Sequence, residues 1–477
     1  MSDRGDMANA RPDEELIDAT AIDQAESRHD EDDRLRPEYV TAVLDAVEDG
    51  DAERARDLVS PLHPADIADL LELTPADRRG AVAAALGDLV GAEVLSELND
   101  YVRDDLIGDL APEQVAGFAA ELDTDDAVAM IEDMDDADQQ AVLDALDPED
   151  RAAIESALSY PEESAGRLMQ RDLVAVPEHM TVGQVIDYLR DHGDLTTDFW
   201  EIYVVDAMHR PVGYCQLSWI LTCPRSVAMA DLMKREQTLI TVDMDQEEVA
   251  LRFQKYALIS AAVVDSGGRL VGMITVDDVV HIISEEAGED ILRLSGAGEG
   301  DINEPILMTV RARLIWLVVN LGTAMLAASV VGLFEGTIER FAMLAALMGI
   351  VSGMGGNAGT QTLAVVVRAL ATNQLTSSNT ARMIGREFRI AATNGATLGT
   401  LIAIGSYVIY GRLDLSLVFG AAILTNNMVA GLAGVLVPVT LERNNVDPAV
   451  SSAVFVTMMT DSLGFFTFLG LATLFLR

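Results

Sequence analysis

A single carboxylate stands inside the last apolar stretch of the chain. Residues 449–476 carry no charge except Asp461. In a helix entering a membrane near Ala449, Asp461 would lie roughly 18 Å deep, where a carboxylate costs about 3 kcal/mol to insert. Such residues usually face a bundle interior or an aqueous path, and the apolar stretches hold no Lys or Arg to pair with it. We therefore predict a cation as its partner, with a buried protonated carboxyl as the alternative.

Two other apolar stretches carry polar groups that could line the same path. Residues 352–361 (SGMGGNAGTQ) crowd four glycines and Asn357 into a stretch long enough for a membrane helix. The glycines would either break the helix and expose carbonyls or let neighbouring helices pack closely. Asn426 and Asn427 lie in a further stretch. These amides are candidates for the path that Asp461 lines.

Oxygen ligands of this kind favour a hard cation. Mg²⁺ gives up its waters reluctantly, so carboxylates and carbonyls around a hydrated ion suit it better than a tight protein cage. The six histidines are dispersed and there are two cysteines, which argues against zinc or copper, although Asp and Asn alone do not exclude Mn²⁺ or Co²⁺. No His-Glu-x-x-His and no Gly-Lys-Ser/Thr occurs, so we expect neither a metalloprotease nor an ATP-driven pump, and no enzyme.

Five charge-poor stretches are each long enough to cross a bilayer as a helix. They cover residues 314–334, 341–367, 390–411, 415–441 and 449–476. One orientation puts seven arginines on one face, namely Arg311, Arg313, Arg368, Arg382, Arg386, Arg389 and Arg443, against Arg340, Arg412 and Arg477 on the other. By the positive-inside rule, the N-terminus is cytoplasmic and the C-terminus outside a cytoplasmic membrane.

The charge of the chain is concentrated before the apolar stretches. Residues 1–300 hold 69 Asp and Glu against 22 Lys and Arg, whereas residues 301–477 hold 9 against 10. So negative a region excludes nucleic acid as a partner and favours cations. Only Lys234 and Lys255 are lysines, a composition typical of halophilic proteins, so most carboxylates are predicted to be solvated surface. Residues 1–35 lack an apolar core and are predicted to be a disordered tail.

Residues 36–160 repeat at an interval of twelve. The repeat is carried by Leu86, Leu98, Leu110, Leu122, Met134, Leu146 and Leu158, with a second apolar residue eight positions after each of four of them, at Phe118, Met130, Val142 and Ile154. The interval suits a helix of about nine residues plus a tight turn, and Asp123 and Asp147 are predicted helix starts. An all-α superhelical domain follows from this pattern.

Residues 165–287 read as a duplicated α/β unit. Strands are predicted at 201–205 with 211–217, and at 260–264 with 269–275, each pair following an amphipathic helix. The unit resembles a tandem pair of CBS domains, at 165–222 and 228–287. In the second, Gly272, Thr275 and Asp278 match a pattern that can hold ATP in CBS domains, with an ordinary turn and helix cap as the alternative.

The whole arrangement resembles the MgtE family of magnesium transporters. GGNAGTQ followed by VVVRALAT, and then VDPAVSSAVFVTMMTDSLG over residues 446–464, match the pore signature of that family. The likeness covers residues 36–477. It implies a multidomain fold: the tail 1–35, an all-α superhelical domain at 36–160, an α/β tandem CBS pair at 165–222 and 228–287, a linker with a plug helix at 288–313, and an α-helical five-crossing membrane domain at 314–477.

The resemblance also implies roles for particular residues. Asp461 matches the pore aspartate, which in a homodimer meets its partner near the twofold axis to hold hydrated Mg²⁺. Thr457 falls where the family offers a backbone carbonyl, and Asn357 matches the first Asn of its glycine-rich segment, although Thr360 stands where a second Asn often occurs. With Asn427, these are the predicted pore residues.

Gating is the last implied property. In the family, cytoplasmic Mg²⁺ bridges acidic residues and closes the pore through a helix before the first crossing, here about residues 303–313. The corresponding residues are Glu286, Glu289, Asp290, Asp301, Glu304 and Asp447. Two alternatives stay open: the same architecture carrying Co²⁺ or Mn²⁺, and a membrane-anchored sensor of ions or nucleotides that transports nothing.

Overall fold

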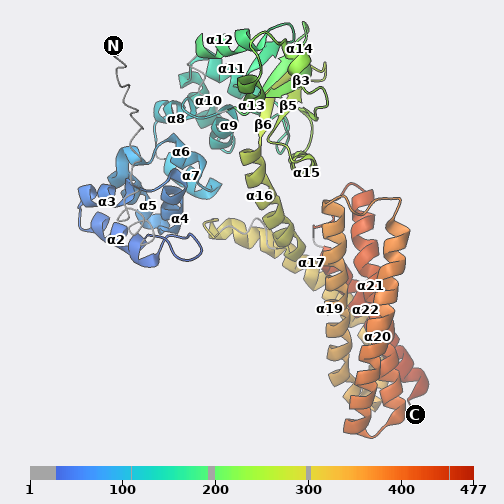
Figure 1. Ribbon diagram of the computed structural model, residues 1–477. Helices are drawn as coiled ribbons and strands as arrows, with labels where there is room; N and C mark the ends of the chain where they lie inside the picture. The colour runs from blue at the N-terminus through green and yellow to red at the C-terminus, as the bar shows by residue number, and fades with distance from the viewer. Residues whose placement is uncertain (1–27, 109, 192–198, 297–301, 451, 477) are drawn as a thin grey trace, which may run out of the picture. The chain divides into compact units, whose positions relative to one another are not determined.

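The computed structural model describes residues 28–108, 110–191, 199–296, 302–450 and 452–476, apart from the side chain of Asp290 (Figure 1). They form two compact units, Met1–Val279 and Val280–Arg477, and the boundary falls inside one helix. The predicted tail lies outside the described residues up to position 27. Residues 28–35 differ from the prediction, because Leu35 is buried in the first domain's core and His29 contacts Asp66.

The first unit begins with short helices joined by tight turns. They are α2 (Pro37–Glu48), α3 (Ala52–Val59), α4 (Pro64–Leu73), α5 (Ala76–Leu86), the 3₁₀ turn η1 (Gly87–Leu89), α6 (Ala92–Ser96), α7 (Asp100–Ile107), α8 (Pro112–Ala119), α9 (Thr124–Ile131), α10 (Asp136–Ala145) and α11 (Pro148–Leu158). Asp123 and Asp147 precede α9 and α11, so both predicted helix starts are confirmed.

The twelve-residue pattern marks the core of these helices. All eleven apolar residues that define it belong to one hydrophobic cluster, with Leu86, Val142 and Ile154 among the most deeply buried. Each helix is too short to bury an apolar face alone, so the stack is held by contacts between neighbouring helices, often a helix and the next but one, as for α8 with α10 and α9 with α11. The predicted superhelical packing is therefore confirmed.

The rest of the first unit is a pair of matching α/β halves. One half has β1 (Ala175–Pro177), α12 (Val182–Asp191), β2 (Glu201–Val205), β3 (Pro211–Gln216) and α13 (Leu217–Thr222). The other has α14 (Met229–Leu232), β4 (Leu239–Thr241), α15 (Gln246–Tyr256), β5 (Ser260–Val264), β6 (Leu270–Thr275) and the start of α16 (Val276–Ser295). Each sheet pairs its first two strands in parallel and its last two antiparallel, as β1-β2-β3 and β4-β5-β6.

The two halves repeat even in their irregularities. Each antiparallel pair shifts register at the same place, between Val204 and Val205 and between Val263 and Val264. Buried polar groups join the halves: Ser260 donates to Glu201 over 2.8 Å, and its hydroxyl also lies 2.8 Å from that of Tyr203. The predicted duplication is confirmed.

The second unit contains the end of α16 and a bundle of long helices. These are α17 (Ile306–Gly332), the short α18 (Glu335–Arg340), α19 (Met343–Ala371), α20 (Thr380–Tyr410), α21 (Leu413–Arg443) and α22 (Ser452–Phe475). In Figure 1, α19 to α22 run side by side, with α21 packed against the other three. Within the described residues α17, α20, α21 and α22 have the length and apolar character of membrane spans.

The fifth long helix, α19, contains the glycine-rich segment 352–361 and is not among these four. It is nevertheless a continuous helix of 29 residues, so the glycines do not break it. Similarly, α17 runs unbroken from Ile306. The segment predicted as a separate plug helix, 303–313, is therefore mostly the beginning of the first long helix.

Candidate functional site

Asp461 is held by a neighbouring helix. It lies ten residues into the 24-residue α22, half-buried, and the Ser352 hydroxyl on α19 donates to its Oδ1 over 2.5 Å. A bond of this length to a carboxylate is a charge-assisted hydrogen bond. In the part of the chain that the structure describes, no cationic side chain pairs with Asp461. Its carboxylate is thus fixed on one side and partly open on the other.

Asn426 fixes the backbone beside that contact. Its Nδ2 on α21 donates to the carbonyl of Val351 over 2.8 Å, and the side chain is 1% exposed. The amide lies between Gly355 and Gly464, and a Cβ added at Gly464 would come within 2.7 Å of Asn426 Nδ2. The absence of side chains at these glycines allows α19, α21 and α22 to meet around one amide, which supports close packing over helix breaking.

The other predicted pore residues divide between two environments. Thr457 lies one turn before Asp461 and is half-buried, and its carbonyl accepts a hydrogen bond from the Thr460 hydroxyl over 3.0 Å. Asn357 is exposed on α19. Asn427, by contrast, is 1% exposed, donates to the Ile423 carbonyl of its own helix, and packs beside Gly395 of α20. These contacts give no support to the prediction that Asn427 lines the same path as Asp461.

Two of the predicted regulatory carboxylates come together on one arginine. Arg293 Nη1 contacts Asp447 Oδ2 over 3.0 Å, and Arg293 also forms an ion pair with Glu289 one turn earlier on α16. Glu286 is half-buried on the same helix, and Glu304 has a buried Oε2 without a hydrogen-bond partner among the described residues. Asp301 and the side chain of Asp290 lie outside the described residues. The Arg293 guanidinium therefore lies between Glu289 and Asp447.

Asp278 is bonded within its own turn. The Thr275 hydroxyl donates to Asp278 Oδ2 over 2.6 Å and the Thr275 N–H donates over 3.3 Å, which is the helix-cap arrangement. Gly272 packs against the segment before β1, because a Cβ there would lie 2.7 Å from Met169 Sδ. Both features have a structural explanation without a nucleotide, so ATP binding at these residues stays a prediction.

Asp278 also faces acidic residues that the sequence did not single out. Burial raises the pKa of Asp278 to about 6, and the negative charges of Asp277 and Asp126 act in the same direction. Burial, followed by the charge of Asp278, raises the pKa of Asp125 on α9 well above its usual value. Asp125 Oδ1 is buried with no hydrogen-bond partner among the described residues. A divalent cation placed here would relieve the repulsion between these carboxylates.

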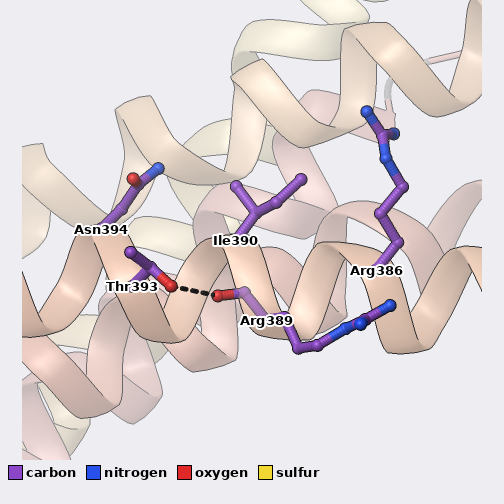
Figure 2. Close-up of a pocket in the computed structure, with 5 residues that line it drawn as sticks. All are labelled: Arg386, Arg389, Ile390, Thr393 and Asn394. Carbon is purple, nitrogen blue, oxygen red and sulfur yellow. Dashed lines mark hydrogen bonds between the residues drawn. The ribbon is translucent and has the colours of Figure 1, made fainter.

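A groove lies elsewhere, along α20 (Figure 2). It is lined by Arg386, Arg389, Ile390, Thr393 and Asn394, and the Thr393 hydroxyl donates to the Arg389 carbonyl over 2.8 Å. It contains none of the predicted site residues. Nowhere in the described ranges do three His, Cys, Asp or Glu side chains gather as a metal-binding group.

Ser352 and Asp125 are the residues that sequence reasoning missed. Ser352 is the first residue of the glycine-rich segment 352–361, but its spacing gives no sign of a contact with residue 461. Asp125 belongs to a run of three aspartates around a helix start, where carboxylates are expected for capping. Both roles depend on contacts between segments that are far apart in sequence.

Together the fold and site define a multi-pass membrane protein with a helical domain and a paired CBS module. Family models agree along the chain: an MgtE intracellular N domain matches residues 62–163, CBS domains match 165–215 and 229–285, and a divalent cation transporter model matches 348–471. The predicted multidomain fold class is confirmed. The chain belongs to the MgtE family of magnesium transporters.

Two relatives are similar to this chain over nearly their full length. The magnesium transporter MgtE of Thermus thermophilus is 32% identical over 450 residues, which cover 93% of this chain and 100% of the relative. That of Bacillus subtilis is 29% identical over 442 residues, covering 92% and 98%. A crystal structure of the cytosolic domain of the Mg²⁺ channel MgtE in complex with ATP is 32% identical, covers 51% of this chain and 99% of its own, and has a TM-score of 0.47.

Proposed function

We propose that this protein carries Mg²⁺ across the cytoplasmic membrane through a homodimeric pore and that cytoplasmic Mg²⁺ regulates it. The observation that carries the proposal is the Asp461 carboxylate, partly open, inside a membrane helix and without a cationic partner among the described residues. Family membership supports Mg²⁺ as the ion. A pore that holds the hydrated ion needs a few fixed oxygen atoms. The Asp461 carboxylate and the Thr457 carbonyl can supply them.

The homodimer is what the resemblance to the family implies, and the number of ligands supports it. One chain contributes a single carboxylate at this depth, whereas two copies related by a twofold axis would contribute a pair. A pair of carboxylates would match the charge of a divalent ion. The partly open faces of Asp461 and Thr457 support this arrangement, since a pore on the axis needs both residues uncovered within one protomer.

Regulation is proposed at the acidic residues outside the membrane helices. Glu289 and Asp447 form one candidate pair, and Asp125 with Asp278 forms another. Glu286, Asp290, Asp301 and Glu304 remain further candidates near the first pair. Cytoplasmic Mg²⁺ would neutralise these carboxylates when it is abundant and hold the pore closed.

We also propose that ATP binds the second CBS half through Thr275 and Asp278. ATP should then raise the melting temperature of the parent chain but not that of Thr275→Ala.

The test is uptake of Mg²⁺ by a magnesium-transport-deficient host that expresses this chain. The Asp461→Ala variant is measured beside it at matched levels in the membrane, with Co²⁺ and Mn²⁺ as competing ions. Uptake by the parent and none by the variant is the expected result. Equal uptake by both would remove Asp461 from the path. No uptake by either, with folded protein in the membrane, would favour a sensor that transports nothing.

A further inference from the structure

We propose that Ser352 is a positioning residue that makes the Asp461 site selective for Mg²⁺ over Ca²⁺. The inference rests on the proposed pore function and adds a specificity determinant to it. Ser352 lies on α19, whereas Asp461 lies on α22, so the hydroxyl reaches the carboxylate from a different helix. A change at Ser352 would therefore alter the ion site without removing its charge.

The contact leaves the two oxygens of the carboxylate unequal. Oδ1 accepts the Ser352 hydroxyl over 2.5 Å, and within the described ranges no other side chain donates to Asp461. Oδ2 is then the oxygen free to face an ion. Without this hydrogen bond the carboxylate could rotate about its side-chain torsions, since nothing else described in the structure restrains it.

The serine itself is presented from a fixed backbone. The preceding residue, Val351, is fully buried, and its carbonyl accepts the Asn426 amide over 2.8 Å. Asn426 Oδ1 is buried with no hydrogen-bond partner among the described residues, which is a cost that the fold tolerates at this position. Because Gly355 and Gly464 close around the amide, residues 351 and 352 cannot move without disturbing three helices.

An unequal carboxylate distinguishes the two ions. Ca²⁺ accepts flexible geometries and often binds a carboxylate through both oxygens, whereas Mg²⁺ retains its waters and demands a regular shell. The Ser352 hydroxyl engages Oδ1, and it therefore weakens two-oxygen binding of a dehydrated Ca²⁺. A single fixed oxygen can still accept hydrogen bonds from the waters of hydrated Mg²⁺. Loss of the hydroxyl should free the carboxylate for Ca²⁺.

The experiment compares the full chain in proteoliposomes with Ser352→Ala, Ser352→Thr and the control Thr372→Ala. Thr372 immediately follows α19, and its hydroxyl donates to the carbonyl of Arg368, a residue of that helix. The readout is the Ca²⁺ concentration that halves Mg²⁺ uptake. For Ser352→Ala we expect this Ca²⁺ concentration to fall about tenfold, which corresponds to the loss of one hydrogen bond to a charged group. Ser352→Thr should restore the parent's value, and the control Thr372→Ala should show the parent's value.

Two outcomes separate the failures. If the parent conducts Mg²⁺ and Ser352→Ala has unchanged sensitivity to Ca²⁺, the inference is overturned while the proposed function stands. If the parent takes up no Mg²⁺, the proposed function fails first. An equal loss of selectivity for Mg²⁺ over Ca²⁺ in Ser352→Ala and Ser352→Thr would also overturn the role of the hydroxyl. Should Ser352→Ala not be monodisperse in detergent, Ser352→Cys, a similar shape with a weak donor, replaces it in the same comparison.

Discussion

At the scale of single residues, the acidic character of the first unit is not uniform. Most of its carboxylates are exposed, as on a solvated surface, whereas Asp125 and Asp278 are half-buried and lie close to each other's charge. Ionising both without a cation opposes folding, because each carboxylate loses water and meets a like charge. The same repulsion would make the pair a good place to bind a divalent ion.

This repulsion gives a pH-dependent prediction. The pKa of Asp278 rises from 3.8 in the unfolded chain to about 6 in the fold, so its contribution to stability is present below pH 3.8 and is lost as the pH rises through 6. In magnesium-free buffer, Asp278→Asn should therefore raise the melting temperature of the full chain at pH 8 more than at pH 5. The control is Asp243→Asn, an exposed carboxylate of the same CBS half. An equal effect at both pH values would contradict the explanation.

Arg293 is the second residue with a testable electrostatic role. Its guanidinium contacts both Glu289 and Asp447, and thereby neutralises two carboxylates proposed to sense Mg²⁺. Arg293→Gln would remove the positive charge between them, so Mg²⁺ should bind there more tightly and inhibit uptake at a several-fold lower internal concentration. Inhibition curves in proteoliposomes measure this. The matched control is Arg235→Gln, because Arg235 is an exposed arginine that donates to a backbone carbonyl. Weaker inhibition by Mg²⁺ in Arg293→Gln would refute the electrostatic role of Arg293.

At the scale of elements, small residues decide how the membrane helices meet. A Cβ at Gly355 would overlap the Asn426 amide, whereas one at Gly353 would meet no atom within 4 Å. Gly355→Ala should therefore destabilise the bundle by about 1 to 3 kcal/mol, the usual cost of overpacking. Gly353→Ala should be neutral or slightly stabilising, since alanine favours the helix. Thermal unfolding of both variants in detergent provides the comparison, and identical melting temperatures would contradict the packing described.

The elements themselves were largely predictable from the sequence. The twelve-residue interval and the β-branched runs report which residues are buried within one repeat or one sheet, and these patterns are local. Contacts between distant helices are not. Asn426 and Asn427 are adjacent in sequence, yet one meets α19 and the other packs beside α20. One residue turns a helix by 100°, and only the neighbouring helices determine which amide points where.

The candidate site was predictable to the same extent. Asp461 stands out because a charge in an apolar stretch is visible in one segment alone. Its partner Ser352 is not visible, because a serine in a glycine-rich stretch is also expected for helix packing. Likewise, the pairing of Asp125 with Asp278 joins residues more than a hundred positions apart, and no local pattern indicates it. The contact of Arg293 with Asp447 also joins residues 154 positions apart, so no local pattern indicates it.

At the scale of the whole molecule, high salt would limit how the acidic surface could act in regulation. At molar salt the Debye length is about 3 Å, so general repulsion between acidic surfaces is screened. Mg²⁺ inhibition of uptake should be unchanged in a fourfold variant in which exposed glutamates of the first domain are replaced by Gln, at Glu53, Glu113, Glu121 and Glu149. By contrast, Asp125→Asn should shift the Mg²⁺ concentration that inhibits uptake. Inhibition curves at high salt test this; loss of inhibition in the fourfold variant would show that bulk charge carries the signal.

The central position of α21 has a consequence for synthesis. This helix packs against α19, α20 and α22, and it is buried along most of its length. The ribosome makes α19 and α20 before it, so both must wait in the membrane without their main partner. A chain stalled before residue 413 would then leave uncovered the faces that α21 packs against, including Thr362 of α19 and Gly395 and Gly399 of α20. Assembly of the bundle is thus a late event, and incomplete chains should be recognisable to quality-control proteases.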